Sequence, residues 1–513
     1  MKRTVILTIL DGWGIGQKDQ SNPIYTVNPS NIQYLKENYP YGSLQASSIS
    51  VGLPWGEEGN SEIGHLNIGT GKIIYQSFPK ISLAINDKSF FENEVLQKAF
   101  NHAKQNNSSI NLIGLLTSGN IHASIKHLKA LIKWGVKEKI PVNLHLITDG
   151  RDSSPTSALN LIKQLPIKDN VYLASISGRF YAMDRDRSWE RTKIAYQAMT
   201  GDVEITDDFQ AYIKKSYSKN PSDEYILPTL IGPENRGIKN NDAIIFFNFR
   251  EDRMRQIVTP FADKNFNIFP VKKIENLYIA TMTEYEKSFN LPVAFNKEKI
   301  NNPLGKVLSD NDKIQLRIAE TQKYPHITYF FNGIREEPFK NEYRILIPSK
   351  TVFNQAQYPK MMAEEITTRA VESINEKSFD FILINYANPD MVAHTGNFNA
   401  CIQAVKFINE QIGRLIKAAE VNDAILIITS DHGNMECVMN PQTGEPQTKH
   451  DPNPVPIHLM AKEFKKNNSS LTIQLAEKNS AGILADIAPT ILELMGLAKP
   501  KEMTGQSLLK TLL

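Results

Sequence analysis

The chain has 513 residues, of which 41% are hydrophobic and 22% charged, and its formal net charge is +3. This length predicts two or three domains, and the composition excludes a chain that is disordered throughout. The small net charge, with no basic tail, gives no support to a nucleic-acid-binding role.

The first predicted element is a buried strand over Thr4–Leu10. Two basic residues precede this apolar run, as in a signal peptide, but Asp11 stops it and no small-residue cleavage site follows. No run approaches the roughly 20 apolar residues that a membrane-spanning helix needs. The chain has only two cysteines, Cys401 and Cys437, so we expect packing roles for both, no disulfide framework and a cytoplasmic location.

Short apolar runs alternate with helical patterns along the chain, which is typical of a mainly parallel sheet with helices on its faces. The clearest helix has apolar residues at three- and four-residue spacing from Ile402 to Ile416. Near the C-terminus, Pro489 suits the first turn of a helix and Gly496 suits its end. The predicted strands include Thr4–Leu10, Ile110–Leu116, Val142–Thr148, Val171–Ile176, Ala243–Asn248, Phe379–Asn385 and Ala424–Thr429.

Three acidic residues, Asp11, Asp390 and Asp431, follow predicted buried strands. Ligands of open α/β sheets bind beyond the carboxyl ends of the strands, so these acids can meet at one edge. The long stretch between the first acid and the other two has its own alternation of strands and helices. We therefore expect an inserted domain. The predicted division assigns residues 1–76 and 311–513 to an outer domain and residues 77–310 to the insertion.

A serine, Ser61, heads the glycine-containing stretch NSEIGHLNIGTGK. Serine alone is a weak nucleophile at neutral pH, and a metal ion at its oxygen is one established remedy. Asp390 and His394 are four residues apart, a spacing that lets both face one ion if the segment is helical. The candidate metal ligands are Asp11, Asp390, His394, Asp431, His432 and His450.

These carboxylate and imidazole ligands suit Mn²⁺, Zn²⁺ or Co²⁺ better than Ca²⁺. Two ions about 3.5–4 Å apart would hold the attacking and leaving oxygens of a phosphoryl transfer. Taken alone, Asp-x3-His and DHG are also compatible with ordinary surface turns. Their joint occurrence at strand ends favours metal binding, so the sequence predicts a metal-activated serine that takes up a phosphoryl group.

The predicted insertion is rich in arginine. Arginine binds carboxylate and phosphate oxygens bidentately, so this set suits a small substrate with several negative charges. Arg187 and Arg191, in the alternating stretch DRDRSWER, are expected to form surface ion pairs instead. In the outer domain, Lys323 would neutralise charge on a phosphoryl group. The candidate substrate-binding residues of the insertion are His122, Arg151, Asp152, Arg179, Arg185, Arg250 and Arg253.

Together these motifs resemble the cofactor-independent phosphoglycerate mutases of the alkaline phosphatase superfamily. The resemblance runs from LDGWG to DIAPTILELMG, through GNSEIGHLNIGTG, LLTSGNIHAS, TDGRDSSP, NFREDR, ETQKYPHITYFFNG, NYANPDMVAHTGN and SDHGN. It implies an α/β fold in which an alkaline-phosphatase-like α/β/α sandwich, the metal-binding domain, is interrupted by an α/β transferase domain, with the active site in the cleft between them. It also implies a monomer that interconverts 2- and 3-phosphoglycerate in glycolysis and gluconeogenesis without 2,3-bisphosphoglycerate.

The same resemblance implies roles for individual residues. Ser61 matches the serine that becomes phosphorylated, and Asp152, with His122, would move protons to and from the glycerate hydroxyls. Two Mn²⁺ ions are implied, with Zn²⁺, Co²⁺ or Mg²⁺ as alternatives. Asp390, His394 and His450 match the ligands of one ion, and Asp11, Ser61, Asp431 and His432 match those of the other. The substrate-binding set is His122, Arg151, Asp152, Arg179, Arg185, Arg250, Arg253 and Lys323.

Two other interpretations stay open. A phosphatase, phosphodiesterase or phosphopentomutase of the same superfamily would share the fold and the metals, and only the arginines of the insertion argue against it. A catalytically inactive, metal-stabilised binding protein for phosphorylated metabolites is the second. The RHG motif of the bisphosphoglycerate-dependent mutases does not occur in this sequence.

Overall fold

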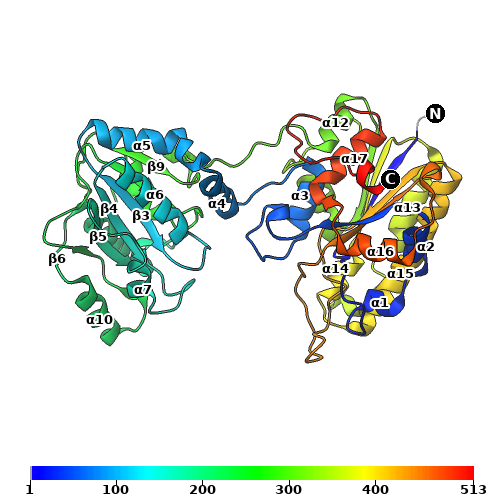
Figure 1. Cartoon of the computed structure of the whole chain (residues 1–513), viewed down its shortest axis with the longest axis horizontal. Helices are drawn as coiled ribbons and strands as arrows, with labels where there is room; N and C mark the ends of the chain where they lie inside the picture. Colours follow the sequence, from blue (N-terminus) through cyan, green and yellow to red (C-terminus); the bar gives the residue numbers. More distant parts are fainter. Residues whose placement is uncertain (1–2) are drawn as a thin grey trace. The chain divides into compact units, whose positions relative to one another are not determined.

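The computed structural model describes residues 3–513 and divides into two compact units, each with its own sheet and core (Figure 1). Unit 1 comprises Met1–Gln76 and Lys299–Leu513, and unit 2 comprises Ser77–Glu298. The sequence placed the second crossing at residue 310, whereas the structure places it twelve residues earlier, at Glu298. The reason is helix α12 (Leu304–Asp310), because its apolar residues Leu304, Val307 and Leu308 are buried in the core of unit 1.

Unit 1 is built on an eight-stranded sheet in the order β11-β10-β12-β1-β13-β14-β2-β15. Its centre is parallel: Leu7 of β1 lies opposite Leu383 of β12 and Ile427 of β13. Strand β14 is antiparallel to both of its neighbours. The strands are β1 (Val5–Leu10), β2 (Tyr41–Gln45), β10 (Gln315–Glu320), β11 (Glu342–Ile347), β12 (Phe381–Tyr386), β13 (Ile425–Thr429), β14 (Val455–Met460) and β15 (Gly482–Ile483).

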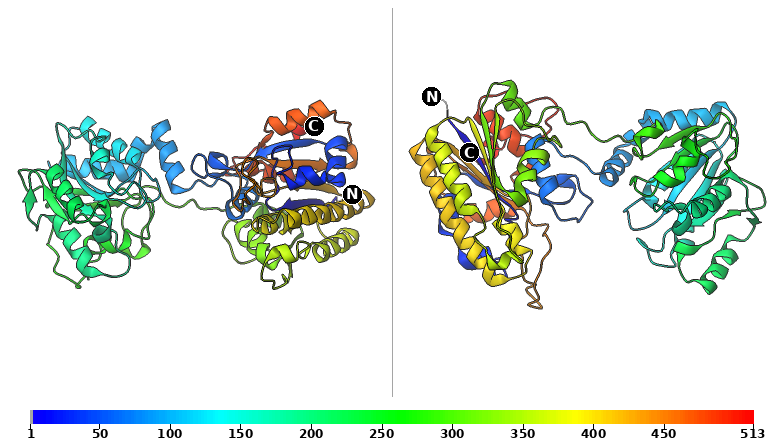
Figure 2. Two further views of the ribbon diagram at one scale, coloured as in Figure 1. Left: turned by 90° about the horizontal axis from the view of Figure 1, so that it is seen from below. Right: turned by 180° about the vertical axis from the view of Figure 1, so that it is seen from behind.

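Helices cover both faces of this sheet (Figure 2). Because successive side chains of a strand point to opposite faces, Ile6 and Leu10 join one core with α13 and α15, while Leu7 and Ile9 join another with α3 and α17. Unit 1 is therefore an α/β/α sandwich. Its helices are α1 (Pro23–Val27), α2 (Ser30–Asn38), α3 (Ser61–Thr70), α12, α13 (Ala363–Glu376), α14 (Asn388–Ala393), α15 (Phe398–Val421), α16 (Ser470–Lys478), α17 (Ile487–Leu494) and α18 (Leu509–Leu512).

Unit 2 has a seven-stranded sheet in the order β6-β7-β5-β4-β3-β8-β9, parallel except where β7 meets β5. The strands are β3 (Ile110–Leu116), β4 (Val142–Thr148), β5 (Val171–Gly178), β6 (Ile205–Thr206), β7 (Thr229–Ile231), β8 (Ala243–Phe246) and β9 (Tyr278–Thr281). The helices are α4 (Ser77–Asp87), α5 (Glu94–Gln105), α6 (Ile125–Lys137), α7 (Ala158–Ile162), α8 (Arg179–Ala182), α9 (Trp189–Thr200), α10 (Phe209–Lys219) and α11 (Arg255–Ala262).

The predicted α/β class is confirmed, and every predicted strand is present with ends shifted by two residues or fewer. The predicted stripe of α15 is buried except at Ile402, which is half-buried, and Cys401 is buried in the same helix. Cys437 is half-buried, and both thiols are free. Over residues 3–513, none of the helices combines the length and the apolar character that crossing a membrane requires.

Candidate active site

Four neighbouring strands of unit 1 deliver the charged residues of one cluster at their carboxyl ends. In sheet order β10, β12, β1 and β13 are followed by Lys323, Asp390, Asp11 and Asp431, respectively. Lys323 lies at the end of the turn Thr321–Lys323, and Asp390 lies in α14. The meeting of the three acids at one sheet edge agrees with the prediction from strand order.

Ser61 is the first residue of α3 and its side chain is buried in this cluster. The helix starts here because the Asn60 side chain caps it, accepting a hydrogen bond from the Ile63 amide at 3.0 Å. Gly64 allows α3 to approach Asp431, because a Cβ at position 64 would lie 2.5 Å from the Asp431 carbonyl oxygen. The hydroxyl thus stands at a helix N-terminus, where negative charge is favoured.

Three groups surround the Ser61 hydroxyl. Lys323 Nζ donates to Ser61 Oγ at 2.7 Å, Asp11 Oδ1 lies 3.1 Å from it, and His432 Nε2 lies 3.0 Å from it. Lys323 Nζ also lies 2.6 Å from Asp11 Oδ1 and 2.7 Å from Asp390 Oδ2. The lysine therefore contacts the predicted nucleophile and two predicted metal ligands at once.

His394 and His450 face each other across Asp390. Each Nε2 lies 3.2 Å from Asp390 Oδ1, and the two Nε2 atoms are 3.1 Å apart. Their Nδ1 atoms lie 2.8 Å from the carbonyl oxygens of Thr448 and Gly59, which can only accept, so each Nδ1 carries the ring proton of the neutral form. In this neutral form both Nε2 atoms are acceptors beside the Asp390 carboxylate, an arrangement that a shared metal cation would stabilise.

A second set of possible ligands adjoins the first. Asp11, Asp431 and His432 offer one atom each within 4.8 Å of one another, as do Asp390, His432 and His450. His432 belongs to both groups. Carboxylate oxygens with imidazole nitrogens form a donor set for Mn²⁺, Zn²⁺ or Co²⁺. The residues of this site therefore suit a divalent metal centre.

The electrostatics of the cluster are dominated by three buried carboxylates facing one lysine. Burial alone would raise the pKa of Asp390, but Lys323 and the surrounding histidines hold it well below its usual value. Burial would lower the pKa of His432, yet the neighbouring carboxylates, Asp431 foremost, raise it to about 9. The surplus of negative charge is what divalent cations would neutralise.

Sequence reasoning missed three residues that orient the ligands. Asn385 Nδ2 donates to Asp11 Oδ2 at 2.8 Å, and Asn434 Nδ2 donates to Asp390 Oδ1 at 2.8 Å. His65 Nδ1 lies 2.9 Å from the Ser61 carbonyl oxygen and 3.1 Å from Asp431 Oδ2. All three lie within motifs quoted from the sequence, but their roles depend on contacts between distant segments.

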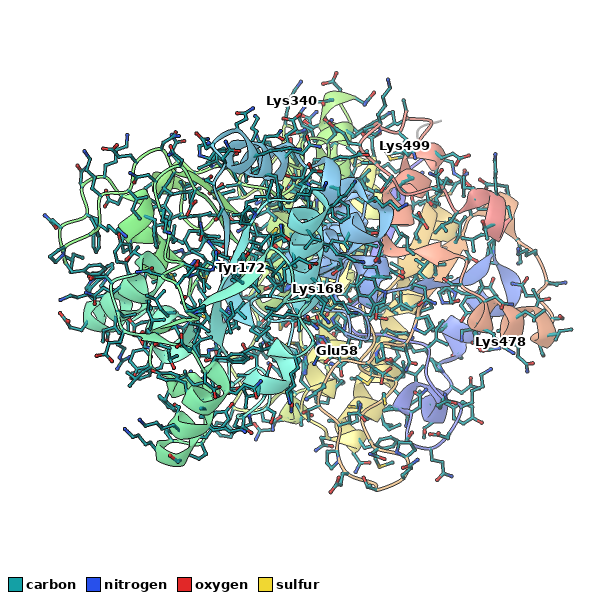
Figure 3. All side chains as sticks on the ribbon, turned by 60° about the vertical axis from the view of Figure 1, so that its left-hand side comes forward. Glu58, Lys168, Tyr172, Lys340, Lys478 and Lys499 are labelled. Atoms are coloured by element: carbon teal, nitrogen blue, oxygen red, sulfur yellow. The ribbon has the colours of Figure 1, made fainter. Side chains whose placement is uncertain are left out.

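The predicted substrate residues of unit 2 also gather at the carboxyl ends of neighbouring strands. In sheet order β5, β4, β3 and β8 are followed by segments that contain Arg179, Arg151 with Asp152, His122, and Arg250 with Arg253. Lys168 and Tyr172, labelled in Figure 3, mark the opposite end of β5. The predicted substrate residues of the insertion thus form one cluster in unit 2, whereas Lys323 belongs to unit 1.

Arg179 is the buried arginine of this cluster, and His122 is buried beside it. Its Nη1 lies 2.6 Å from Asp149 Oδ1 and 2.8 Å from Asp152 Oδ2. His122 Nε2 lies 3.9 Å from Asp152 Oδ2. Burial, with the Arg179 charge nearby, lowers the pKa of His122 to about 4, so its imidazole is neutral at pH 7.

Three other arginines, Arg151, Arg185 and Arg250, are half-exposed and paired with acids that the sequence analysis did not select. Asp252 Oδ2 lies 2.8 Å from Arg185 Nη1, and Asp252 Oδ1 lies 3.2 Å from Arg250 Nε. Arg151 Nη2 lies 2.7 Å from Glu224 Oε1. Asp252 stands in the quoted motif NFREDR, so its position in sequence was a usable signal.

Arg253, Arg191 and Arg187 differ in their partners and exposure. Arg253 Nη1 donates to the Met183 carbonyl oxygen at 3.1 Å. Arg191 pairs with Asp184 at 3.0 Å, as expected for a structural ion pair, and Arg187 is exposed.

Comparisons with known proteins agree with this geometry. Residues 3–499 match the family model described as the Metalloenzyme superfamily. The 2,3-bisphosphoglycerate-independent phosphoglycerate mutase of Clostridium botulinum (strain Langeland) is 43% identical, over 99% of this chain and 100% of its own length. The enzyme of that name from Clostridium novyi (strain NT) is 44% identical over 99% and 100%.

A solved structure, that of Leishmania mexicana phosphoglycerate mutase at low cobalt concentration, aligns with a TM-score of 0.52 and 25% identity. The alignment covers 99% of this chain and 97% of that one. The full-length identity to these relatives and the superfamily match lead to one conclusion: the chain belongs to the Metalloenzyme superfamily and, within it, to the family of the 2,3-bisphosphoglycerate-independent phosphoglycerate mutases.

Proposed function

We propose that this protein interconverts 2- and 3-phosphoglycerate through a phosphoserine at Ser61, without 2,3-bisphosphoglycerate. The observation that carries the proposal is the position of Ser61 Oγ, 2.7 Å from Lys323 Nζ at the N-terminus of α3, among candidate metal ligands. The names and full-length similarity of the relatives support the same reaction. The enzyme is taken to be a cytoplasmic monomer with small-molecule substrates and no nucleic-acid or membrane partner.

The proposal includes two Mn²⁺ ions, with Zn²⁺, Co²⁺ or Mg²⁺ as alternatives. When bound, such ions would polarise the phosphoryl oxygens and lower the pKa of the serine hydroxyl. The converging Nε2 atoms of His394 and His450 support the first position. Asp390, His394 and His450 would hold one ion, and Asp11, Ser61, Asp431 and His432 would hold the other.

In the first transfer, Ser61 Oγ bonds to phosphorus, its hydroxyl proton passes to Asp11 Oδ1, and the bond from phosphorus to the glycerate oxygen breaks. The proton returns to Ser61 when the phosphoryl group leaves it. Lys323 Nζ is within hydrogen-bond reach of Ser61 Oγ, so it can stabilise charge on the transferring group. Asp11 Oδ1 accepts from the hydroxyl and so orients a lone pair of the nucleophile. The helix N-terminus favours the phosphoserine that results.

In this proposal the cluster of unit 2 binds the glycerate and transfers protons to and from its hydroxyl groups. Its arginines bind the carboxylate, and Asp152 gives a proton to the glycerate oxygen that leaves phosphorus and takes one from the other hydroxyl when the phosphoryl group returns. Arg179 fixes the Asp152 carboxyl at 2.8 Å. The neutral imidazole of His122 is able to assist in the same proton transfers.

A mutase differs from a phosphatase in keeping the glycerate until the phosphoryl group returns. The arginine cluster favours the mutase, because a compact substrate with both carboxylate and phosphate gives these arginines partners that a simple phosphate ester lacks. The alternative of a hydrolase on the same metal centre is therefore a defined outcome of the test.

The test supplies metal-loaded protein with 3-phosphoglycerate, free of 2,3-bisphosphoglycerate, and follows 2-phosphoglycerate and free phosphate together. We expect rapid interconversion with little phosphate released, and a phosphorylated peptide containing Ser61 after acid quenching. Phosphate release without interconversion would assign a hydrolase. Interconversion that requires added 2,3-bisphosphoglycerate would also refute the proposal.

A further inference from the structure

Glu436 is a buried carboxyl group whose partners are two backbone amides and one side-chain amide rather than cations. It is 2% exposed. Its Oε2 accepts hydrogen bonds from the amides of Gly14 and Asn434, both at 2.9 Å. Its Oε1 accepts one from Asn453 Nδ2 at 3.3 Å. One side chain therefore joins three segments that are far apart in sequence.

Each of these segments carries candidate metal ligands, and we call them the ligand loops: residues 11–16, 431–436 and 450–454. They contain, respectively, Asp11; Asp431 with His432; and His450. The backbone links them further, since Met435 N donates to the Gly12 carbonyl oxygen at 2.8 Å and Asp451 N to the Gly433 carbonyl oxygen at 3.0 Å. Glu436 occupies the space that these links enclose.

Three glycines make room for this side chain. A Cβ at Gly14 would lie 2.1 Å from Glu436 Oε1, one at Gly433 would lie 2.3 Å from the same atom, and one at Gly16 would lie 2.7 Å from Glu436 Cγ. Real Cβ contacts are not that short, so a larger residue at any of these positions would force the Glu436 side chain to shift. This close approach explains Gly14 and Gly16 of LDGWGIG and Gly433 of DHGN, whereas a Cβ at Gly12 would instead meet Asp390 at 2.9 Å.

We propose that Glu436 is a positioning residue that holds the three ligand loops in the arrangement that binds metal. It acts through the loops, since it accepts hydrogen bonds from Gly14, Asn434 and Asn453 rather than from a ligand side chain. This inference rests on the proposed function only in taking Asp11, Asp431, His432 and His450 as metal ligands. Groups that orient the ligands of a metal affect affinity by about 10- to 100-fold when they are removed.

The role depends on acceptor geometry rather than on charge. Burial, with the Asp451 carboxylate nearby, raises the pKa of Glu436 to about 7. Both backbone donors converge on a single oxygen, and the side-chain amide of glutamine also offers one oxygen at that position. Glu436→Gln should therefore preserve the arrangement, whereas Glu436→Ala removes it.

Asp486 provides a matched control. It is also a buried carboxyl group of unit 1, and it accepts from the amides of Ile483 at 2.8 Å and Gln506 at 2.7 Å. Neither of these segments carries a candidate ligand. Asp486→Ala should thus lower thermal stability without changing metal affinity.

The experiment titrates Co²⁺ into metal-free protein and measures its visible absorption and affinity, with Mn²⁺ competition as a second readout. We expect Glu436→Gln to stay within about twofold of wild type, and Glu436→Ala to bind about 10- to 100-fold more weakly. If Glu436→Ala does not fold, Glu436→Asp, which sets the carboxyl group back by one methylene, replaces it with an expected loss of about tenfold.

Wild-type affinity in folded Glu436→Ala, or an equal loss in Glu436→Gln and Asp486→Ala, would overturn the inference. The metal titration contains no phosphoglycerate, so its result does not depend on whether the proposed mutase reaction occurs. Absence of interconversion with normal metal affinity would refute the reaction and leave the positioning role of Glu436 standing.

Discussion

Lys323→Met tests whether the buried lysine serves the reaction, the metal-free fold, or both. Its Nζ lies 2.6 Å from Asp11 Oδ1 and 2.7 Å from Asp390 Oδ2. Coulomb's law with an effective dielectric constant of about 20 gives roughly 6 kcal/mol for each contact. Most of this attraction is offset by desolvation, and removing one partner of a buried pair costs about 3–5 kcal/mol net.

We therefore expect Lys323→Met to lower the unfolding free energy of metal-free unit 1 by about 3–5 kcal/mol. Bound divalent cations would neutralise the same carboxylates, so the loss should shrink when metal is present. The lysine also donates to Ser61 Oγ, and loss of one such donor costs about 2.7–4 kcal/mol of transition-state stabilisation, or about 10²–10³ in kcat.

The assay compares thermal unfolding with and without Mn²⁺, and kcat at saturating Mn²⁺ and 3-phosphoglycerate. Lys306→Met, which removes an exposed lysine paired with Asp310 four residues away, is the control and should change neither quantity appreciably. A Lys323→Met enzyme with kcat within tenfold of wild type would refute the catalytic role. Equal destabilisation with and without metal would refute the competition between lysine and cations.

Four further outcomes are expected. Ser61→Ala should abolish interconversion and the Ser61 phosphopeptide without lowering the thermal midpoint; substantial residual activity would exclude Ser61 as nucleophile. Chelation should stop the reaction and Mn²⁺ should restore it, so undiminished turnover in demonstrably metal-free protein would contradict the metal centre. Asp252→Asn should raise KM about tenfold, about 1.4 kcal/mol, with kcat nearly unchanged, because Arg185 and Arg250 lose their common partner; the exposed Asp186→Asn is its control. Burial lowers the pKa of the His458 imidazole in the folded protein to about 3. As pH falls below about 6.5, the imidazole is therefore protonated in the unfolded state but not in the folded state, and the free energy of unfolding falls by about 1.4 kcal/mol by pH 5.5. His458→Phe should make the pH dependence of the thermal midpoint between pH 7 and 5.5 shallower, and an unchanged slope would exclude the assignment.

The sequence was sufficient to locate seven strands, among them β1, β12 and β13 with the acids that follow them, but not β10, which precedes Lys323, or β14. Apolar runs such as Ile110–Leu116 are continuous because both faces of a parallel sheet are covered, and this makes them recognisable. Since parallel strands end at one edge, the positions of Asp11, Asp390 and Asp431 also predicted their meeting. The arginines were selected for their chemistry with anionic substrates, and the two ligand groups came from the family resemblance.

What could not be predicted are contacts that depend on three-dimensional register. The pairing of Asp252 with Arg185 and Arg250 joins two loops with no local periodicity. Glu436 could not be recognised because its partners are backbone amides, which every residue type except proline offers. The boundary at which the chain returns from unit 2 to unit 1 was misplaced because the sequence of α12 is that of an ordinary amphipathic helix. Only its packing assigns this helix to unit 1.

The position of β1 in the middle of the unit 1 sheet has a consequence for biosynthesis. This strand leaves the ribosome long before its neighbours β12 and β13, which are made only after all of unit 2 and more than half of unit 1. Unit 2 is continuous in sequence, so it can fold while the apolar segment Val5–Leu10 still awaits its partners. A chain that stops before Phe381 would carry a permanently unpaired apolar strand, and such fragments should aggregate or become substrates for chaperones and proteases.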